Sequence, residues 1–405
     1  MEVALPSGTP LAGYGSLPRR AWLPDLLGRR AHAFWFRPAA GVHDPLRVRA
    51  LLLQSGSTRL LWLAADLVGI DGRLLPDLAG RLERHGMRPS AVIAAASHTH
   101  SGPGAFADSA VLGPIAVDRL SPAVRVAILD AFERAALEAG GRMGPAAAGS
   151  AAIVVPGIAR SRIGAPLDEE LGLLKVVDPQ GRPRALVWNY AVHGTALSRD
   201  NLLLSGDLMA EAGARLEREL GAPALFVNGA EADVSPRGRG WDGVRETGQT
   251  LARAAMGAWG GIAAEPRPAL DVAIVRSPLP QPAVSVRSCL GRWVPEGMRL
   301  GLSATFPASI EVLAVRVGRS AWVVIPGELE TRLGREIKTA RAAGLRHVFV
   351  IGVANGYLGY LLTPEVSRRP SYIACASVYG PRGGEIVRDA ALDALKRLTA
   401  RGERR

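Results

Sequence analysis

A run of small apolar residues, Ala91–Ala96, leads directly into a loop that carries two histidines, Ser97-His98-Thr99-His100-Ser101-Gly102-Pro103-Gly104. Such a run is typical of a strand buried in a sheet, and the glycines and the proline that follow end the strand sharply. In α/β sheets, ligands bind in the crevice outside the carboxyl ends of the strands. Two imidazoles in this position indicate a metal site or a proton-transfer site. The alternative is a pair of hydrogen-bonded polar residues at a strand end.

The same arrangement recurs further along the chain, where predicted strands run into loops that contain glycine. His193 follows the strand Arg184–Ala191, and Glu328 follows the strand Ala321–Ile325 after a Pro-Gly turn. The remaining polar residues of this kind are Asp233 and Ser235 after Ala222–Val227, and Tyr357 and Tyr360 after His347–Val353. Any one of them alone is a weak signal, because a glutamate after a turn is often only the favoured start of a helix.

Taken together, these residues make a plausible ligand set for zinc. Two neutral imidazoles and one carboxylate leave a coordination position for water, and a phenol could bind the metal weakly or hydrogen-bond a developing oxyanion. Other hydrolase signatures are absent, including His-Glu-x-x-His and the Gly-x-Ser-x-Gly nucleophile elbow. The residues by themselves therefore indicate a zinc hydrolase and leave its substrate open.

The pattern of predicted elements favours an α/β fold with mixed β-sheets flanked by helices. Hairpins are predicted around Ser55-Gly56-Ser57-Thr58, Asp178-Pro179-Gln180-Gly181 and Gly318-Arg319-Ser320. Helices are predicted over 71–85, 121–139, 207–220, 243–259, 329–343 and 385–401. Residues 1–45 are expected to lie across the surface, and residues 264–310 to be irregular apart from a strand at Leu270–Arg276. With no internal repeat or linker, residues 1–405 are expected to form a single large catalytic domain.

Hydropathy, the first residues and the cysteines indicate where the protein is located. No apolar stretch is long enough for a transmembrane helix, and the first residues do not resemble a signal peptide. The two cysteines, Cys289 and Cys375, form neither a disulfide framework nor a CxxC site, which fits a reducing compartment. We therefore expect a cytoplasmic or peripheral membrane protein.

The net charge of +12 has to be interpreted with care. All but three of the 49 basic residues are arginine, in a chain rich in alanine and glycine, which suggests a bias of genome composition. The arginines are spread along the chain and do not form the concentrated stripe of a nucleic-acid-binding protein, so no nucleic-acid partner is expected. Contact with an anionic membrane surface is another possible use of the charge.

The motifs extend this interpretation, because the chain resembles the catalytic domain of the neutral/alkaline non-lysosomal ceramidases. The resemblance rests on seven segments in the order of that family: Gly41–Ala50, Ser97–Gly104, Ala191–Thr195, Leu204–Asp207, Asn228–Pro236, Pro326–Glu328 and Asn355–Glu365. The His-Thr-His-Ser-Gly-Pro-Gly element is the most specific, and together the segments span nearly the whole chain.

The resemblance implies roles for individual residues. The catalytic zinc of the family would be held by His98, His193, Glu328 and Tyr360, with Tyr357 as the alternative tyrosine. His100 would contact substrate or shuttle a proton. Ser235 matches a serine that is either the nucleophile or part of the binding site for the polar head of the substrate, and a zinc-bound hydroxide favours the second role. The sequence around Arg160 resembles an Asn-Arg-Ser element, so Arg160 would line the site.

The implied reaction is hydrolysis of an N-acyl amide, with ceramide giving sphingosine and fatty acid. The chain also departs from the family pattern. It ends in a predicted helix where the family usually continues into a C-terminal β-sandwich domain, and Asn-Arg-Ser-Pro reads Ala159-Arg160-Ser161-Arg162. Two alternatives therefore stay open: a zinc amidohydrolase for another N-acyl or lipid amide, and a non-catalytic lipid-binding relative. Oligomeric state is not predicted.

Overall fold

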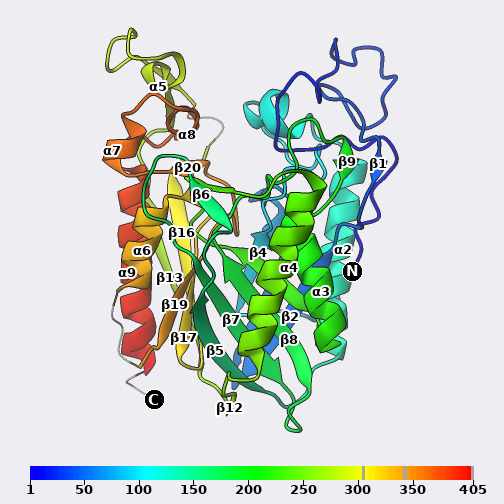
Figure 1. The fold of residues 1–405 in the computed structure, drawn as a ribbon, viewed down its shortest axis with the longest axis vertical. Helices are drawn as coiled ribbons and strands as arrows, with labels where there is room; N and C mark the ends of the chain where they lie inside the picture. The colour runs from blue at the N-terminus through cyan, green and yellow to red at the C-terminus, as the bar shows by residue number, and fades with distance from the viewer. Residues whose placement is uncertain (303–305, 341–343, 403–405) are drawn as a thin grey trace.

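The structure is a computed structural model that describes residues 1–302, 306–340 and 344–402. Within these residues, three large mixed sheets form the centre of the molecule (Figure 1). The first sheet has the order β2 (Val48–Ser55), β3 (Thr58–Ala65), β4 (Ala91–Ala96). The second has the order β10 (Ala224–Asn228), β8 (Pro183–Tyr190), β7 (Glu170–Val177), β5 (Ala147–Val154), β12 (Glu265–Pro266). The third has the order β13 (Leu270–Pro278), β16 (Ser309–Val317), β17 (Ser320–Val324), β19 (His347–Ile351).

Each large sheet contains an antiparallel hairpin followed by one parallel pair. The parallel pairs are β3 with β4, β8 with β10, and β17 with β19. Parallel neighbours need a crossover, and a helix provides it each time: α1 (Leu74–Arg84), α3 (Asp207–Leu220) and α6 (Thr331–Lys338). As a result, the carboxyl ends of these strands carry the loops in which the sequence predicted functional residues.

The three sheets share one apolar core. Alternate residues of β3, β8 and β17 face this core, among them Trp62, Val187 and Trp322. The residues between them, such as Leu63, Trp188 and Val323, face outward onto helices. Because both faces are buried, these strands read as continuous apolar runs and not as alternating ones.

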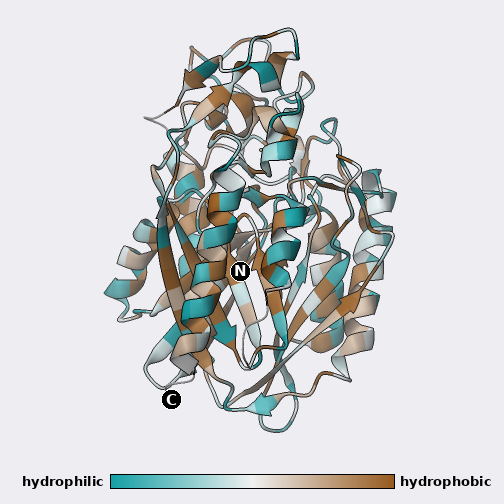
Figure 2. Cartoon of the chain, turned by 90° about the vertical axis from the view of Figure 1, so that its left-hand side faces the viewer, coloured by the Kyte–Doolittle hydropathy of each residue, from teal (hydrophilic) through white to brown (hydrophobic). Residues whose placement is uncertain are grey.

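The helical layer packs on the outer faces of the sheets (Figure 1). α1 and α2 (Pro122–Gly141) cover the first sheet, α3 and α4 (Gly240–Trp259) cover the second, and α6 and α9 (Gly383–Gly402) cover the third. Figure 2 shows that the strands are mostly hydrophobic, whereas the helices alternate between hydrophobic and hydrophilic residues. The predicted fold class, mixed sheets flanked by helices, is confirmed.

Short elements surround the end of the molecule at which these parallel strands finish. They are β1 (Gly41–Val42) with β9 (Leu203–Leu204), β6 (Ala159–Ser161) with β11 (Val234–Pro236), β14 (Ala283–Ser285) with β15 (Arg299–Gly301), β18 (Glu328–Leu329) with β20 (Tyr360–Leu361), the π-helical turn η1 (Gly113–Val117), and the helices α5 (Val286–Leu290), α7 (Pro364–Ser367) and α8 (Tyr372–Cys375). The sequence did not predict most of them, because strands and helices of two to five residues carry little periodicity.

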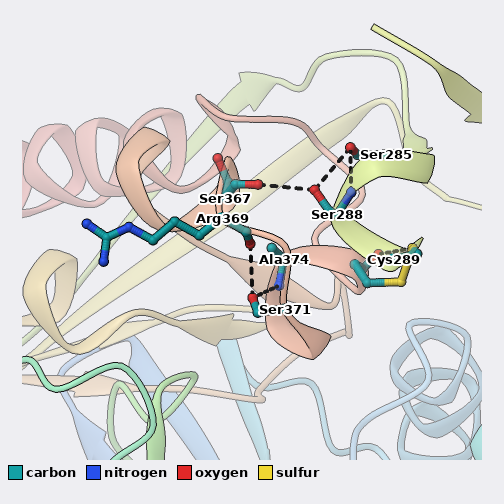
Figure 3. The surroundings of a disulfide bond; sticks show 8 residues. Ser285, Ser288, Cys289, Ser367, Arg369, Ser371 and Ala374 are labelled. Carbon is teal, nitrogen blue, oxygen red and sulfur yellow. Dashed lines mark hydrogen bonds between the residues drawn. A yellow bond between two sulfur atoms is a disulfide. The ribbon is translucent and has the colours of Figure 1, made fainter. Parts of the chain in front are cut away.

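The two cysteines correct one prediction, because Cys289 and Cys375 form a disulfide. It joins α5 to α8 and closes a small lobe, within which Ser288 donates a hydrogen bond to the Ser367 carbonyl and Ser371 caps α8 (Figure 3). A separation of 86 residues hid the pairing, since only the fold brings the two segments together. The disulfide also removes the argument for a reducing compartment.

Two further expectations need adjustment. The helix after Glu328 ends at Lys338, earlier than the expected end at 343, and residues 341–343 lie outside the described ranges. Residues 1–45 lie on the surface as expected, but Arg19 is buried and donates hydrogen bonds to the carbonyls of Ala12 and His100. Among the described residues, no helix combines the length and apolar character needed to cross a membrane.

Candidate functional site

Five of the predicted residues converge at the carboxyl ends of the parallel strands. His98 and His100 follow β4, His193 follows β8, Glu328 begins β18 after β17, and Tyr360 lies in β20 beside Glu328. His193 Nε2 lies 3.0 Å from Glu328 Oε2, and His98 Nε2 lies 3.6 Å from the same oxygen. The Tyr360 hydroxyl lies 3.5 Å from His193 Nε2. All five residues are buried, as expected of a site enclosed by the sheets.

The backbone at His98 is held in an unusual conformation. Its φ is +63°, in the left-handed region that residues other than glycine rarely adopt. Its N–H donates to the Leu67 carbonyl. Two residues later, the His100 N–H donates to the Gly194 carbonyl, which joins this loop to the loop that carries His193. A strained backbone that its surroundings hold in place is a frequent property of functional sites.

Asn228, at the end of β10, joins two of the strand ends. Its side-chain carbonyl accepts the Val192 N–H, and its amide donates to the carbonyls of Val192 and Ser97. Through these bonds the loops that carry His98 and His193 are fixed to one side chain. Asn355 has a similar role, since it bonds to the backbone of Val92 and Ala94 in β4 from the loop that carries the tyrosines.

The hydrogen bonds of His98 fix its tautomer. Nδ1 lies 2.6 Å from the Val68 carbonyl, which can only accept, so Nδ1 carries the proton. Nε2 is the nitrogen that faces Glu328 Oε2, and it lies 3.4 Å from His100 Nε2. Burial lowers the pKa of His193 to about 3, so His193 is neutral. Two imidazole Nε2 atoms that face one carboxylate oxygen are arranged as ligands of a cation.

The neighbouring donors support this interpretation. Tyr357 donates to Glu328 Oε1 over 2.5 Å, which fixes the carboxylate, while Glu328 Oε2 has no hydrogen-bond partner among the described residues. Burial, followed by the charge of Glu328, raises the pKa of Tyr360 well above its ordinary value. Of the two tyrosines, Tyr360 is thus the one beside His193, and Tyr357 contacts the far oxygen of the carboxylate. The donor set of imidazoles, a carboxylate and a phenol fits Zn²⁺.

Ser235 lies beside this cluster on β11. Its hydroxyl accepts a 2.7 Å hydrogen bond from Arg162 Nε. The same guanidinium donates to the Tyr360 hydroxyl and to the Ala232 carbonyl. Asp233, by contrast, binds the backbone N–H and the hydroxyl of Thr331 at the start of α6, which is a structural role.

Arg160 does not occupy its predicted position. Its side chain is exposed, and Arg162 is the arginine that contacts Ser235 and Tyr360. The two arginines are separated by one residue in a chain rich in arginine, so the resemblance to a short Asn-Arg-Ser element could not distinguish them. In the pairing of β6 with β11, Arg160 lies opposite Ser235, yet the side chain that bonds to the Ser235 hydroxyl is that of Arg162.

One buried acid escaped the sequence analysis altogether. Glu231 is fully buried, and a carboxylate oxygen of it lies within 4.8 Å of the ligand atoms of His98 and Glu328. Burial, followed by the charge of Glu328, raises the pKa of Glu231 well above its ordinary value. The available signal was its position after β10, in the segment that also carries Asp233 and Ser235.

The N-terminal residues close one side of the site. The Tyr14 ring packs on His100 with ring centroids 4.8 Å apart, and Gly13 lies so close to His100 that a Cβ on it would be 2.6 Å from the imidazole. On the other side, Tyr372 of α8 packs edge-on against Tyr360. Two segments far apart in sequence thus meet the same cluster from opposite sides.

Comparison with known proteins gives this arrangement a family. Residues 32–250 match the model for "Neutral/alkaline non-lysosomal ceramidase, N-terminal". Neutral ceramidase 2 of Arabidopsis thaliana is 28% identical over 49% of this chain and 28% of its own length. The neutral ceramidase of Mycobacterium tuberculosis is 23% identical over 84% of this chain and 70% of its own length.

The fold agrees with the same family. The crystal structure of neutral ceramidase from Pseudomonas aeruginosa superposes with a TM-score of 0.84 at 21% identity, over 99% of this chain and 73% of that one. The chain spans only about 28% of the length of the plant relatives that it matches. Since the family model covers more than half of the residues, this chain belongs to the neutral/alkaline non-lysosomal ceramidase family.

Proposed function

We propose that this protein hydrolyses an N-acyl amide bond with the help of zinc, and that ceramide, cleaved to sphingosine and fatty acid, is its substrate. The observation that carries the proposal is the buried convergence of His98, His193 and Glu328, with the Nε2 atoms of both imidazoles turned toward one carboxylate oxygen. The names of the relatives support ceramide. We further propose that residues 1–405 act as one catalytic domain.

In this proposal His98, His193, Glu328 and Tyr360 hold the zinc, and Tyr357 orients Glu328. Zinc held by these residues would supply Lewis acidity, with which it would lower the pKa of water to about 7 and polarise the amide carbonyl, so no side chain would be needed as the nucleophile. The burial of these residues removes competing water and strengthens the electrostatic interactions among them.

The other residues of the site bind and transfer protons. His100 is neutral, because burial lowers its pKa well below the usual value, and its ring lies next to His98, so it can carry a proton to the leaving amine. The Arg162 guanidinium brings positive charge to Tyr360 and Ser235, where it stabilises a developing oxyanion. Ser235, held by Arg162, binds the polar head of the substrate.

Two alternatives make different predictions. A zinc amidohydrolase for N-acyl amino acids or other lipid amides would keep the zinc chemistry and reject ceramide. A non-catalytic lipid-binding relative would bind no zinc. We also propose peripheral contact with an anionic membrane, consistent with the net charge of +12.

The test is release of fatty acid from ceramide and from N-acyl amino acids by the zinc-replete protein in detergent, with and without a chelator. Chelator-sensitive release from ceramide is the expected result. Release only from the other amides would discard ceramide, and no release from a protein that binds zinc would overturn the catalytic proposal for both classes.

The role of Ser235 has its own test. Ser235→Ala should raise KM and leave measurable kcat, because the nucleophile is water. An acyl group trapped on Ser235 of the native protein would reverse this assignment.

A further inference from the structure

Glu231 is a buried acid without a structural function that the contacts can explain. Neither of its carboxylate oxygens has a hydrogen-bond partner among the described residues. Its neighbours in sequence are accounted for differently: Asp233 binds Thr331, and Ser235 binds Arg162. A buried carboxylate without a partner costs several kcal/mol if it is charged, so it needs a proton or a cation.

The fold provides room for this carboxyl group at the metal site. Glu231 follows β10, and Gly352 follows β19, so the two meet where the second and third sheets meet. A Cβ on Gly352 would lie 2.7 Å from Glu231 Oε2 and 2.4 Å from the Gly229 carbonyl. Position 352 therefore excludes any side chain. A carboxylate oxygen of Glu231 lies within 4.8 Å of the ligand atoms of His98 and Glu328.

From this position we infer that Glu231 is a second carboxylate ligand of the metal, beside His98 and Glu328. The inference rests on the proposed metal site. Two carboxylates would balance the charge of a divalent cation held otherwise by neutral imidazoles, and the unpartnered oxygens of Glu231 would gain a partner. The matched segment Asn228–Pro236 contains this glutamate, but the resemblance assigns Glu231 no role at the metal.

The test is zinc affinity, measured by competition with a chromogenic chelator, together with the absorption spectrum of the cobalt-substituted protein. Glu231→Gln keeps the size of the side chain and should weaken zinc binding by about tenfold or more and change the cobalt spectrum. Glu330→Gln is the matched control, because Glu330 is buried but bonded to Thr363. It should leave the zinc affinity unchanged.

The results separate this inference from the proposed function. Unchanged zinc affinity in Glu231→Gln would overturn the ligand role while the metal site stands. Absence of zinc binding in the native protein would overturn both. If Glu231→Gln does not fold, Glu231→Asp, which retains a carboxylate on a shorter arm, is expected to show an intermediate affinity, and native affinity in it would contradict the inference.

A second, independent observation concerns two apolar projections at the end of the molecule that holds the site. We name residues 14–36 the N-terminal arm and residues 283–301 the disulfide lobe. Figure 1 shows the blue arm and the yellow lobe with α5 on opposite sides of this end. Each projection is connected to the cluster. The arm contacts it through Tyr14, which packs on His100. The lobe is joined by its disulfide to α8, and Tyr372 of α8 packs on Tyr360.

Both projections present large apolar side chains to solvent. Trp22 in the arm is 95% exposed and Trp293 in the lobe is 78% exposed. The other apolar residues that are more than half exposed are Leu17, Leu23, Leu26 and Leu27 in the arm and Leu290, Met298 and Leu300 in the lobe. Grouped exposed apolar residues mark an interaction surface, and tryptophan and leucine beside arginine are typical of segments that insert into a lipid interface.

The charge around these side chains selects the partner. The arm with Arg37 contains five arginines, of which Arg19 is buried, and one acid, Asp25, whose carboxylate is already bonded to the backbone of Arg29 and Arg30. The lobe contains three arginines and one acid, Glu296. We propose that the arm and the lobe together dock on an anionic lipid bilayer, which would present the site to a lipid substrate. This proposal deepens the proposed function and rests on it only for the substrate.

The test is co-sedimentation with vesicles of phosphatidylcholine alone or mixed with phosphatidylserine. The native protein should bind the mixed vesicles, and Trp22→Ala/Leu26→Ala and Trp293→Ala/Leu300→Ala should each weaken binding by about tenfold. Ile274→Ala, an exposed apolar residue on β13, is the matched control. A native protein that binds neither vesicle would overturn the proposal. The proposal would also be overturned if the native protein formed dimers and bound no vesicles, and the variants lost the dimers. A second copy of the chain would then be the partner that covers the surface.

Hydrolysis assays on two forms of ceramide distinguish docking on the membrane from the hydrolytic reaction. The docking variants should lose activity on ceramide in vesicles and retain it on a short-chain ceramide in solution. Equal activity on both substrates would show that the projections do not deliver substrate. Failure of every protein to hydrolyse ceramide would discard the proposed function, while vesicle binding would still decide the docking surface.

Discussion

The cluster at the strand ends and the rim above it differ in what holds them together. His98 and His193 follow strands buried on both faces, and Asn228 ties the loops that carry them. Glu328 follows the buried strand β17. The rim, made of the N-terminal arm and the disulfide lobe, consists of short elements with exposed apolar side chains and one disulfide. The proposed chemistry is thus placed on the most deeply buried part of the molecule, and the proposed contact with a membrane on exposed short segments.

The strongest test of this division removes a ligand from the rigid cluster. His98→Ala or His193→Ala should abolish zinc binding and hydrolysis without unfolding the protein, because the sheets do not depend on either imidazole. Metal analysis, a hydrolysis assay and circular dichroism measure the three properties. His85→Ala, at an exposed histidine paired with Glu133, should change none of them. Retained turnover in a ligand variant would contradict the assignment.

A structural residue of the cluster should affect stability first. Asn228→Ala leaves buried backbone groups of Val192 and Ser97 without partners and should lower the free energy of unfolding by about 3 kcal/mol in urea titrations. Gln54→Ala, an exposed amide in the β2–β3 hairpin, is expected to have almost no effect. An equally mild effect of Asn228→Ala would show that the strand ends are held by packing alone.

Substitution of the two neighbouring arginines tests which of them belongs to the cluster and which to the exposed surface. Arg162→Ala should lower kcat/KM by about a hundredfold, since it removes the charge beside Tyr360 and Ser235. Arg160→Ala should leave kcat/KM nearly unchanged, because that side chain is exposed. The reverse order would restore Arg160 as the arginine of the site.

Asp207, at the start of α3, links stability to pH. Burial raises the pKa of its carboxyl to about 6 from its ordinary value of 3.8. Between these values the unfolded chain releases the proton first, so this group lowers the free energy of unfolding as pH rises, by about 1.4 kcal/mol per pH unit. Asp207→Asn should lack this component in urea titrations from pH 4 to pH 6. A pH dependence that persists unchanged would assign it to other groups.

The smallest expected effect on the cluster comes from the rim. Cys289→Ser with Cys375→Ser should leave the zinc affinity unchanged, because neither cysteine contacts a proposed ligand. Hydrogen exchange should instead increase in α5 and α8, which the disulfide joins. A loss of zinc affinity would show that the lobe supports the site, so that the cluster and the rim would not be independent.

The central parts of the fold were predictable because their signals are local. Buried runs such as Ala91–Ala96 and hairpin turns such as Ser55–Thr58 specify strands, and the functional residues directly follow those strands in sequence. The short pairs β6–β11 and β18–β20 were not predictable, because each joins segments far apart and contains too few residues for a periodicity.

The sequence by itself determined that His98, His193 and Glu328 would lie at strand ends with chemistry suited to a metal, since residue type and strand boundaries are local properties. Only the tertiary structure decided that Arg162 and not Arg160 contacts Ser235, that Glu231 is buried without a partner, and that Cys289 pairs with Cys375. Each of these depends on distances between segments that no local pattern encodes. The physical reason is that the packing of three sheets around one core sets these contacts. Which side chains become neighbours therefore depends on the whole fold and not on any one segment.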